Sequence, residues 1–149
     1  MNWKSGVKVS LWTIVALFGF SCPGTQAQTP VFKHTRWVCV QEHFVADAGT
    51  LTETYTLEFT SGKECLWKDS WILPAHPAMY MNRNGTVDTI PASGSEKVSR
   101  ATWRFSRNKL TLQFEDGSTK VFLYEDGRLS GPGPFDTQLV FELVKGAAD

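Results

Sequence analysis

The clearest signal in the sequence is an alternation of apolar and polar residues with a period of two, which begins near Thr35. Ala101, Trp103 and Phe105 alternate with polar neighbours, and a polar turn at 106–108 then leads into a second alternating run. Because residues i and i+2 lie on one face of a strand, this pattern predicts strands joined by hairpin turns. No comparable stripe with a 3.6-residue period is found over this part of the chain, so we expect an all-β domain.

Short turn signals divide this part of the chain into further strands. Asp116-Gly117 and Asp126-Gly127 each follow an aromatic residue and a glutamate, and Asp-Gly supplies the positive φ angles of a tight hairpin turn. The other expected strands span residues 37–44, 51–60, 64–73 and 139–143. The sequence therefore predicts a meander in which consecutive strands are neighbours.

The stretch 74–96 departs from this alternation. Pro74 and Pro77 interrupt it, and proline cannot donate to a strand ladder. We expect an exposed hairpin over 79–90 that turns at Asn84-Gly85, followed by a loose connector at 91–95. We also expect this excursion to be the most mobile part of the domain.

About eight strands joined mostly by hairpins predict an antiparallel meander that closes into an up-and-down barrel, with a β-sandwich as the alternative. Closure removes the two unpaired edges through which an open sheet tends to associate. The segment 121–124 is apolar on both faces, so we expect Phe122 and Tyr124 to form an outer surface that something covers.

The N-terminal residues have the features of a secretory signal peptide, predicted over 1–27. Lys4 and Lys8 precede a twelve-residue apolar run at 9–20, which is too short to cross a bilayer as a helix. Small residues favour cleavage after Ala27, while Ser21-Cys22 supports the alternative of a lipoprotein anchored through Cys22. We therefore expect an exported protein without a transmembrane helix in the mature chain, with a linker at 28–34 and a barrel domain at 35–149.

Composition agrees with one globular domain, since 149 residues with 42% hydrophobic content can form one core. Removing residues 1–27 takes two of the 15 basic residues and no acidic one, which leaves 13 basic against 15 acidic residues. A net charge near −2 disfavours nucleic-acid binding, which needs a positive excess.

Cysteine usage predicts a disulfide between Cys39 and Cys65, the pair left unmodified in an oxidising compartment, with two separate buried thiols as the alternative. Bridged cysteines have Cα atoms within about 7 Å, whereas next-but-one strands lie roughly 9 to 10 Å apart. A disulfide would therefore require the first strand to bend over the barrel end, or a more complicated strand order.

The strand pattern resembles that of small bacterial lipocalin-like proteins of the calycin group. The resemblance rests on Trp37 at the start of the first strand, Phe59-Thr60-Ser61-Gly62 at the end of the second, the hairpins over 103–129 and the closing strand at 139–144. The chain departs from that family at Thr35, where a glycine is usual, and in lacking a C-terminal helix. The resemblance implies a cup that receives a small, largely apolar molecule.

Strand parity selects the residues expected to contact such a ligand. Cys65, Trp67, Asp69 and Trp71 share one face of their strand, and Trp37, Cys39, Gln41 and His43 share one face of the first strand. We expect the Cys65 face to point inward, whereas on the first strand both faces carry apolar residues and either can face the core. If the Trp37 face points inward, Gln41, His43 and Asp69 meet a ligand or water at the rim. The expected ligand-binding residues are Trp37, Gln41, His43, Trp67, Asp69, Trp71, Trp103 and Phe105, with Phe114 also lining the interior.

Catalytic and metal-binding motifs are absent from the sequence, which contains no G-x-S-x-G, H-E-x-x-H, phosphate loop or C-x-x-C. We therefore expect no enzyme activity, no metal and no cofactor. The predicted function is that of an exported binding protein for a small hydrophobic ligand. The alternatives are an envelope domain that binds another protein, a structural β domain without a ligand, or a carbohydrate-binding module in which Trp67 and Trp71 stack on sugars.

Overall fold

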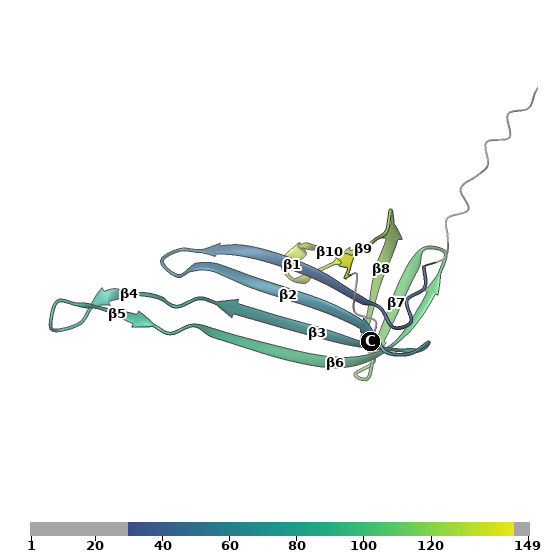
Figure 1. Cartoon of the computed structure of the whole chain (residues 1–149), viewed down its shortest axis with the longest axis horizontal. Coiled ribbons are helices and arrows are strands. Elements are labelled where there is room, and N and C mark those ends of the chain that lie inside the picture. Colours follow the sequence, from purple (N-terminus) through teal and green to yellow (C-terminus); the bar gives the residue numbers. More distant parts are fainter. Residues whose placement is uncertain (1–29, 145–149) are drawn as a thin grey trace, which may run out of the picture. The chain divides into compact units, whose positions relative to one another are not determined.

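The computed structural model describes residues 30–144, and these residues form a closed β-barrel with a two-stranded hairpin (Figure 1). The elements are β1 (Arg36–Val45), β2 (Gly49–Phe59), β3 (Glu64–Leu73), β4 (His76–Met81), β5 (Val87–Ile90), β6 (Ser93–Ser106), β7 (Lys109–Phe114), β8 (Thr119–Glu125), β9 (Arg128–Pro132), the short 3-10 helix η1 (Pro134–Asp136) and β10 (Gln138–Leu143). The predicted signal peptide and Cys22 lie outside the described residues.

The barrel has the strand order β1-β10-β9-β8-β7-β6-β3-β2, and all of its pairs are antiparallel. Each barrel strand pairs with the next barrel strand along the chain, and β10 returns to pair with β1. The β4–β5 hairpin is inserted between β3 and β6 and forms a sheet of its own. This topology confirms the predicted all-β up-and-down barrel of eight strands and replaces the sandwich alternative.

Two hairpins of the C-terminal half have the tight two-residue turns predicted from the sequence, and the hairpin between them does not. Between β6 and β7, Arg107 and Asn108 have φ angles of 51° and 61°, and between β8 and β9, Asp126 and Gly127 have φ angles of 49° and 78°. Two consecutive positive φ angles give the two-residue turn whose twist matches that of the flanking strands. The β7–β8 connection is longer, and of its Asp-Gly pair only the glycine has a positive φ angle.

The strands of the barrel differ in length, and this difference determines the shape of the domain. β1, β2, β3 and β6 have 10 to 14 residues, whereas β7 to β10 have 5 to 7. β10 pairs with β1 only at Trp37 and Val38, and β7 pairs with β6 only from Ala101 onward. The remaining parts of the four long strands extend beyond the barrel as a four-stranded sheet (Figure 1).

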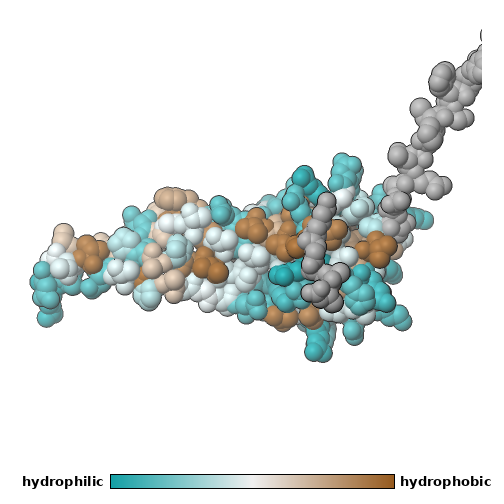
Figure 2. Space-filling view, in the orientation of Figure 1, coloured by the Kyte–Doolittle hydropathy of each residue, from teal (hydrophilic) through white to brown (hydrophobic). Residues whose placement is uncertain are grey.

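We call this extension the protruding sheet, comprising residues 40–45, 49–54, 69–73 and 93–98. Its existence corrects the prediction of a loose connector at 91–95, because β6 begins at Ser93 and pairs with the full length of β3. The predicted hairpin beyond it is confirmed as β4–β5, whose Met79, Tyr80 and Met81 are exposed. Figure 2 shows apolar patches among the polar surface of the hairpin and the protruding sheet.

Aromatic rings fill one end of the barrel around Phe32, which lies in the segment 28–34 that is predicted to be a linker. The Phe32 ring lies 5.0 to 6.2 Å, between ring centroids, from five other aromatic rings. Those rings belong to Trp37, Phe59, Trp103, Phe105 and Tyr124. We call this the Phe32 end, and it is a packed aromatic core.

Aliphatic and aromatic side chains continue the core through the middle of the barrel. The fully buried residues there include Leu57, Leu110, Leu112, Phe122, Leu129 and Phe141. Phe122 and Tyr124 therefore point inward, and the prediction that they form an outer surface is wrong. Val121 and Leu123 are the exposed residues of that strand. Alternation alone could not decide between the two faces, because both are apolar.

The predicted disulfide between Cys39 and Cys65 is not formed, and both residues are buried free thiols. β2 lies between them: Cys39 is opposite Tyr55, while Cys65 is opposite Phe59, four residues further along β2. Two strand spacings and a four-residue offset separate the cysteines by far more than the roughly 7 Å that a bridge allows. Burial raises the pKa of Cys65 to about 12 and also raises the pKa of Cys39.

Candidate functional site

The barrel end opposite Phe32, which we call the mouth, opens onto the inner face of the protruding sheet. The β7–β8 turn and η1 lie at this end, because β7 ends there and β10 begins there. Cross-strand register places Tyr55 of β2 opposite Asp69 of β3, and Asp69 opposite Lys97 of β6. The side chains of these three residues share the inner face with Trp67, which confirms the inward parity predicted for β3.

A cavity of about 320 Å³ occupies the mouth. It is lined by Tyr55, Trp67, Asp69, Lys97, Ser99, Phe114, Asp116, Ser118, Lys120, Gly133, Pro134 and Leu139. The lining thus combines apolar side chains with carboxylate, ammonium and hydroxyl groups. A volume of this size, at the lower end of the range for small-molecule sites, suits a small ligand.

The charged groups of the mouth converge without pairing. Among the ion pairs found between described residues, none joins Asp69, Lys97 or Lys120 to another charge within 4.0 Å. The Lys120 ammonium instead lies 5.1 Å from the centre of the Trp67 ring, where a cation–π interaction holds it. Burial raises the pKa of Asp69, and the nearby Glu53 carboxylate raises it further. Lys120 and Lys97 partly offset this increase.

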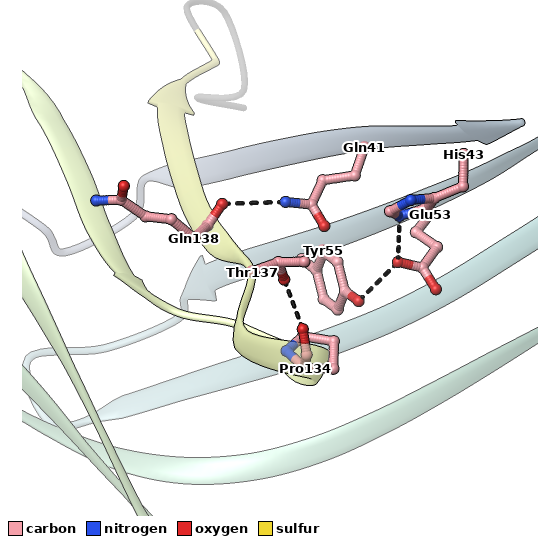
Figure 3. A network of polar contacts seen from close by, with 7 residues as sticks. All are labelled: Gln41, His43, Glu53, Tyr55, Pro134, Thr137 and Gln138. Carbon is pink, nitrogen blue, oxygen red and sulfur yellow. Dashed lines mark hydrogen bonds and ion pairs between the residues drawn. The ribbon is translucent and has the colours of Figure 1, made fainter.

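Further out on the inner face, Glu53 organises a polar network, shown in Figure 3. Its Oε2 atom lies 3.2 Å from His43 Nε2 and accepts a hydrogen bond from the Tyr55 hydroxyl at 3.1 Å. Burial and the neighbouring Glu53 carboxylate raise the pKa of Tyr55, so the phenol stays protonated and donates. The network fixes the Tyr55 hydroxyl against the rim of the cavity.

Gln41 joins the barrel at the seam where β1 and β10 separate. Its Nε2 atom donates a hydrogen bond to the Gln138 carbonyl at 3.0 Å (Figure 3). Its Oε1 atom is buried and has no hydrogen-bond partner among the described residues. Gln41 therefore bridges the seam and does not line the mouth cavity.

The η1 segment at the rim has an unusual backbone. Phe135 and Asp136 have φ angles of 55° and 60°, a left-handed conformation that costs non-glycine residues free energy. Thr137 stabilises the turn by donating from its hydroxyl to the Pro134 carbonyl at 2.7 Å. The Phe135 side chain is 95% exposed, so the turn holds an aromatic ring in solvent beside the cavity.

The structure separates the predicted ligand-binding residues into three groups. Trp37, Trp103 and Phe105 belong to the packed Phe32 end. Trp67 and Asp69 line the mouth cavity, as does Phe114. Gln41, His43 and Trp71 lie on β1 and β3 beyond it, where Trp71 is opposite Glu53 and 38% exposed.

The sequence did not identify the other residues of the mouth, among them Tyr55, Lys97, Ser99 and Lys120. Strand alternation can assign each of these residues to one face of its strand. It does not show that Lys97 and Tyr55 lie next to Asp69, because that depends on the register between strands. Lys120 was missed because a lysine on a strand is expected to face water. It points inward here because its stem covers the Trp67 ring at the open end.

Two larger cavities, of about 520 and 480 Å³, follow β6 where β7 turns away from it. The first has outward-facing side chains in its lining, including Glu64, Leu66, Arg100 and Thr102. The second lies between β6 and the β7–β8 turn and has little apolar lining besides Val98 and Phe114. The first also touches the core residues Cys65 and Ala101. The mouth cavity is lined largely by side chains of the inner face, including Tyr55, Trp67 and Leu139 of the core, so we take it as the candidate site.

Protein-family models, curated proteins and solved structures give no match to this chain. The lipocalin-like resemblance therefore rests on strand pattern and barrel topology. Within residues 30–144, no helix is long and apolar enough to cross a membrane. The same residues contain no cluster of three or more His, Cys, Asp or Glu side chains that could hold a metal ion.

Proposed function

We propose that the protein is an exported binding protein that holds a small molecule at the mouth of its barrel. The observation that carries this proposal is the mouth cavity of about 320 Å³, with unpaired charged groups above a packed aromatic core. Side chains that converge on a cavity without satisfying one another leave hydrogen-bonding capacity for a ligand. Export rests on the sequence features of residues 1–27.

The lining changes the expected chemistry of the ligand. A largely apolar molecule deep in the barrel would compete with the rings packed around Phe32. A molecule at the mouth would place its apolar part against Trp67, Phe114 and Leu139 and its polar part toward Asp69 and the lysines. The lipocalin-like cup is therefore retained in the proposal, with a shallower and more polar site.

A steric block at the mouth tests this function. Ser99 lines the cavity from β6, while its neighbour Val98 points to the outer face. In a thermal-shift screen of small metabolites, a ligand should raise the melting temperature of the native chain. Ser99→Trp should weaken the binding of that ligand about tenfold or more, and Val98→Trp should not. Equal binding by the two variants, or no ligand in the screen, would contradict the proposal.

The protruding sheet favours a second candidate, an interaction domain that binds another protein. Phe44 and Ile72 are 83% and 61% exposed on its outer face, and large apolar side chains in water often mark contact surfaces. A photo-crosslinking residue at position 44 should then give a defined adduct in the cell envelope, while one at Leu123 on the barrel wall should not. Adducts of the same pattern at both positions would argue against a specific interface.

A further inference from the structure

The charges that line the mouth balance one another. Asp69 and Asp116 supply two carboxylates, and Lys97 and Lys120 supply two ammonium groups, so the lining has no formal net charge. Asp116 already accepts hydrogen bonds from the backbone and hydroxyl of Ser118. Asp69 and the two lysines also line the cavity, and none of them forms an ion pair with another described residue. The site therefore offers acceptors and donors together.

This balance excludes two classes of ligand on energetic grounds. A hydrocarbon chain would remove water from Asp69 and the lysines without replacing its hydrogen bonds, which costs about 1 to 3 kcal/mol or more for each group. A lone anion would gain the lysines but would also meet Asp69, which lies opposite Lys97. A hydroxyl group avoids both penalties, because it donates to a carboxylate and accepts from an ammonium group.

An accessible aromatic ring lies beside these groups. Trp71 follows Asp69 on the same face of β3, roughly 7 Å further along the strand. The Trp71 side chain is 38% exposed, whereas Trp67 is 6% exposed and carries Lys120 over its ring. Trp71 thus supplies a flat apolar surface against which the C–H face of a sugar ring can pack. Of the two tryptophans predicted to stack on sugars, only Trp71 has a ring that a sugar can reach.

A second set of polar groups lies beside Trp71. Glu53 is directly opposite Trp71 across the β2–β3 pair and is held by His43 and Tyr55. The inner face therefore presents a mixed charged cluster and, further along the strands, an aromatic ring with a carboxylate beside it. This arrangement fits an elongated molecule with hydroxyl groups on more than one ring.

We propose that the ligand of the mouth is a polyhydroxylated molecule, a sugar or short glycan, that extends from Asp69 and Lys120 onto the Trp71 ring. This inference rests on the proposed function, because it names the ligand class of the same site. Hydroxyl groups bridge the carboxylate and the lysines, and one ring lies on Trp71. The conformation of the barrel is already suited to such a ligand, since Lys120 is held in place by Trp67.

The test compares three kinds of probe on the full-length protein by isothermal titration calorimetry. The probes are a panel of neutral oligosaccharides of glucose, galactose, mannose and N-acetylglucosamine, the fatty carboxylate decanoate, and the amphipathic dye 1-anilinonaphthalene-8-sulfonate. We expect a panel oligosaccharide to bind more tightly than either of the other two probes.

Matched variants locate the binding. Asp69→Asn and Trp71→Ala should each weaken oligosaccharide binding about tenfold or more. Glu96→Gln is the control for Asp69→Asn, and Ile72→Ala is the control for Trp71→Ala. Both control residues lie nearby on the outer face of the sheet, so these substitutions should leave the affinity within about twofold. Thermal unfolding of each variant separates loss of binding from loss of fold.

Each result decides between the two proposals. Oligosaccharide binding that depends on Asp69 and Trp71 supports the inference. Oligosaccharide binding unaffected by both substitutions overturns it. Decanoate or dye binding that Ser99→Trp abolishes, with no oligosaccharide bound, overturns the inference and leaves the proposed function standing. Binding of no probe, together with an empty metabolite screen, overturns both.

Discussion

The barrel and the protruding sheet are built from the same four long strands, yet they differ in what covers their inner face. In the barrel, the short strands β7 to β10 close over β1, β2, β3 and β6, and side chains such as Leu57 and Phe122 are fully buried. In the protruding sheet, the short strands do not reach that face, and the Trp71 side chain on it is 38% exposed. Stability is therefore concentrated in the barrel, whereas the sheet presents surface, and the mouth lies where the two meet.

Truncating a core ring is expected to have the largest effect. Phe122→Ala removes a fully buried side chain that packs against Trp67 and Phe141, and should lower the free energy of unfolding by about 3 to 5 kcal/mol. Phe44→Ala is the matched control in the protruding sheet and should change it by less than about 0.5 kcal/mol. Urea denaturation measures both, and similar losses would remove the distinction between the two regions.

Close packing in the barrel wall gives the next largest effect. A Cβ atom at Gly131 would lie 2.5 Å from Phe122 Cδ1 and 2.8 Å from the Val121 carbonyl oxygen. Gly131→Ala should therefore destabilise the protein by about 1 to 3 kcal/mol in the same assay. Gly62→Ala, where a Cβ atom meets nothing within 4 Å, should have little effect. A tolerated Gly131→Ala would mean that the core is looser than its contacts indicate.

At the mouth, pH should alter stability through Asp69. Its pKa is raised in the folded state by burial and by Glu53, so the folded protein takes up this proton at a higher pH than the unfolded chain. Its contribution therefore strengthens as pH falls from neutrality toward the unfolded pKa near 3.8, where it is complete. Above the folded pKa, the ionised carboxylate opposes folding.

Asp69→Asn removes this cost, so the variant should be slightly more stable than the native protein at pH 7. The gain should stay below about 1 kcal/mol, since water screens a half-buried carboxylate. Urea denaturation at several pH values should show that this gain in unfolding free energy becomes smaller as the pH is lowered. Glu96→Gln should show no such gain. A variant destabilised at neutral pH would indicate that Asp69 is paired in the folded protein.

Removing the β4–β5 hairpin should have the smallest effect. Its strands pair with each other in a separate sheet, and most of their side chains are exposed. Replacing residues 76–90 with a short Gly-Asn turn should leave the unfolding free energy unchanged within about 0.5 kcal/mol. A large loss would place the hairpin among the elements that stabilise the barrel.

The contrast between the regions also explains how far sequence reasoning could go. Alternation, Asp-Gly turns and the proline interruption were sufficient to predict the meander, the inserted hairpin and the inward face of β3. They could not predict how far a strand extends beyond its neighbours, because the first half of β6 is polar and lacks the alternation that marks its second half. The protruding sheet follows from pairing lengths that only the structure provides.

The candidate site was partly predictable for a related reason. Parity identified Trp67, Asp69 and Trp71, which lie within one strand. Lys97 and Lys120 required cross-strand register, and Phe32 required knowledge of which segment closes the barrel end. The assumed disulfide failed because cysteine number alone says nothing about the four-residue offset along β2.

The most direct test of the account uses the tryptophan indole N–H signals in a ¹⁵N–¹H spectrum, recorded with the tightest-binding panel oligosaccharide. Trp67 and Trp71 face the mouth and the protruding sheet, whereas the Trp37 and Trp103 indoles donate to Thr35 Oγ1 and the Ser61 carbonyl at the Phe32 end. We predict that the Trp71 and Trp67 signals shift while those of Trp37 and Trp103 stay in place. Shifts confined to Trp37 and Trp103 would contradict a site at the mouth.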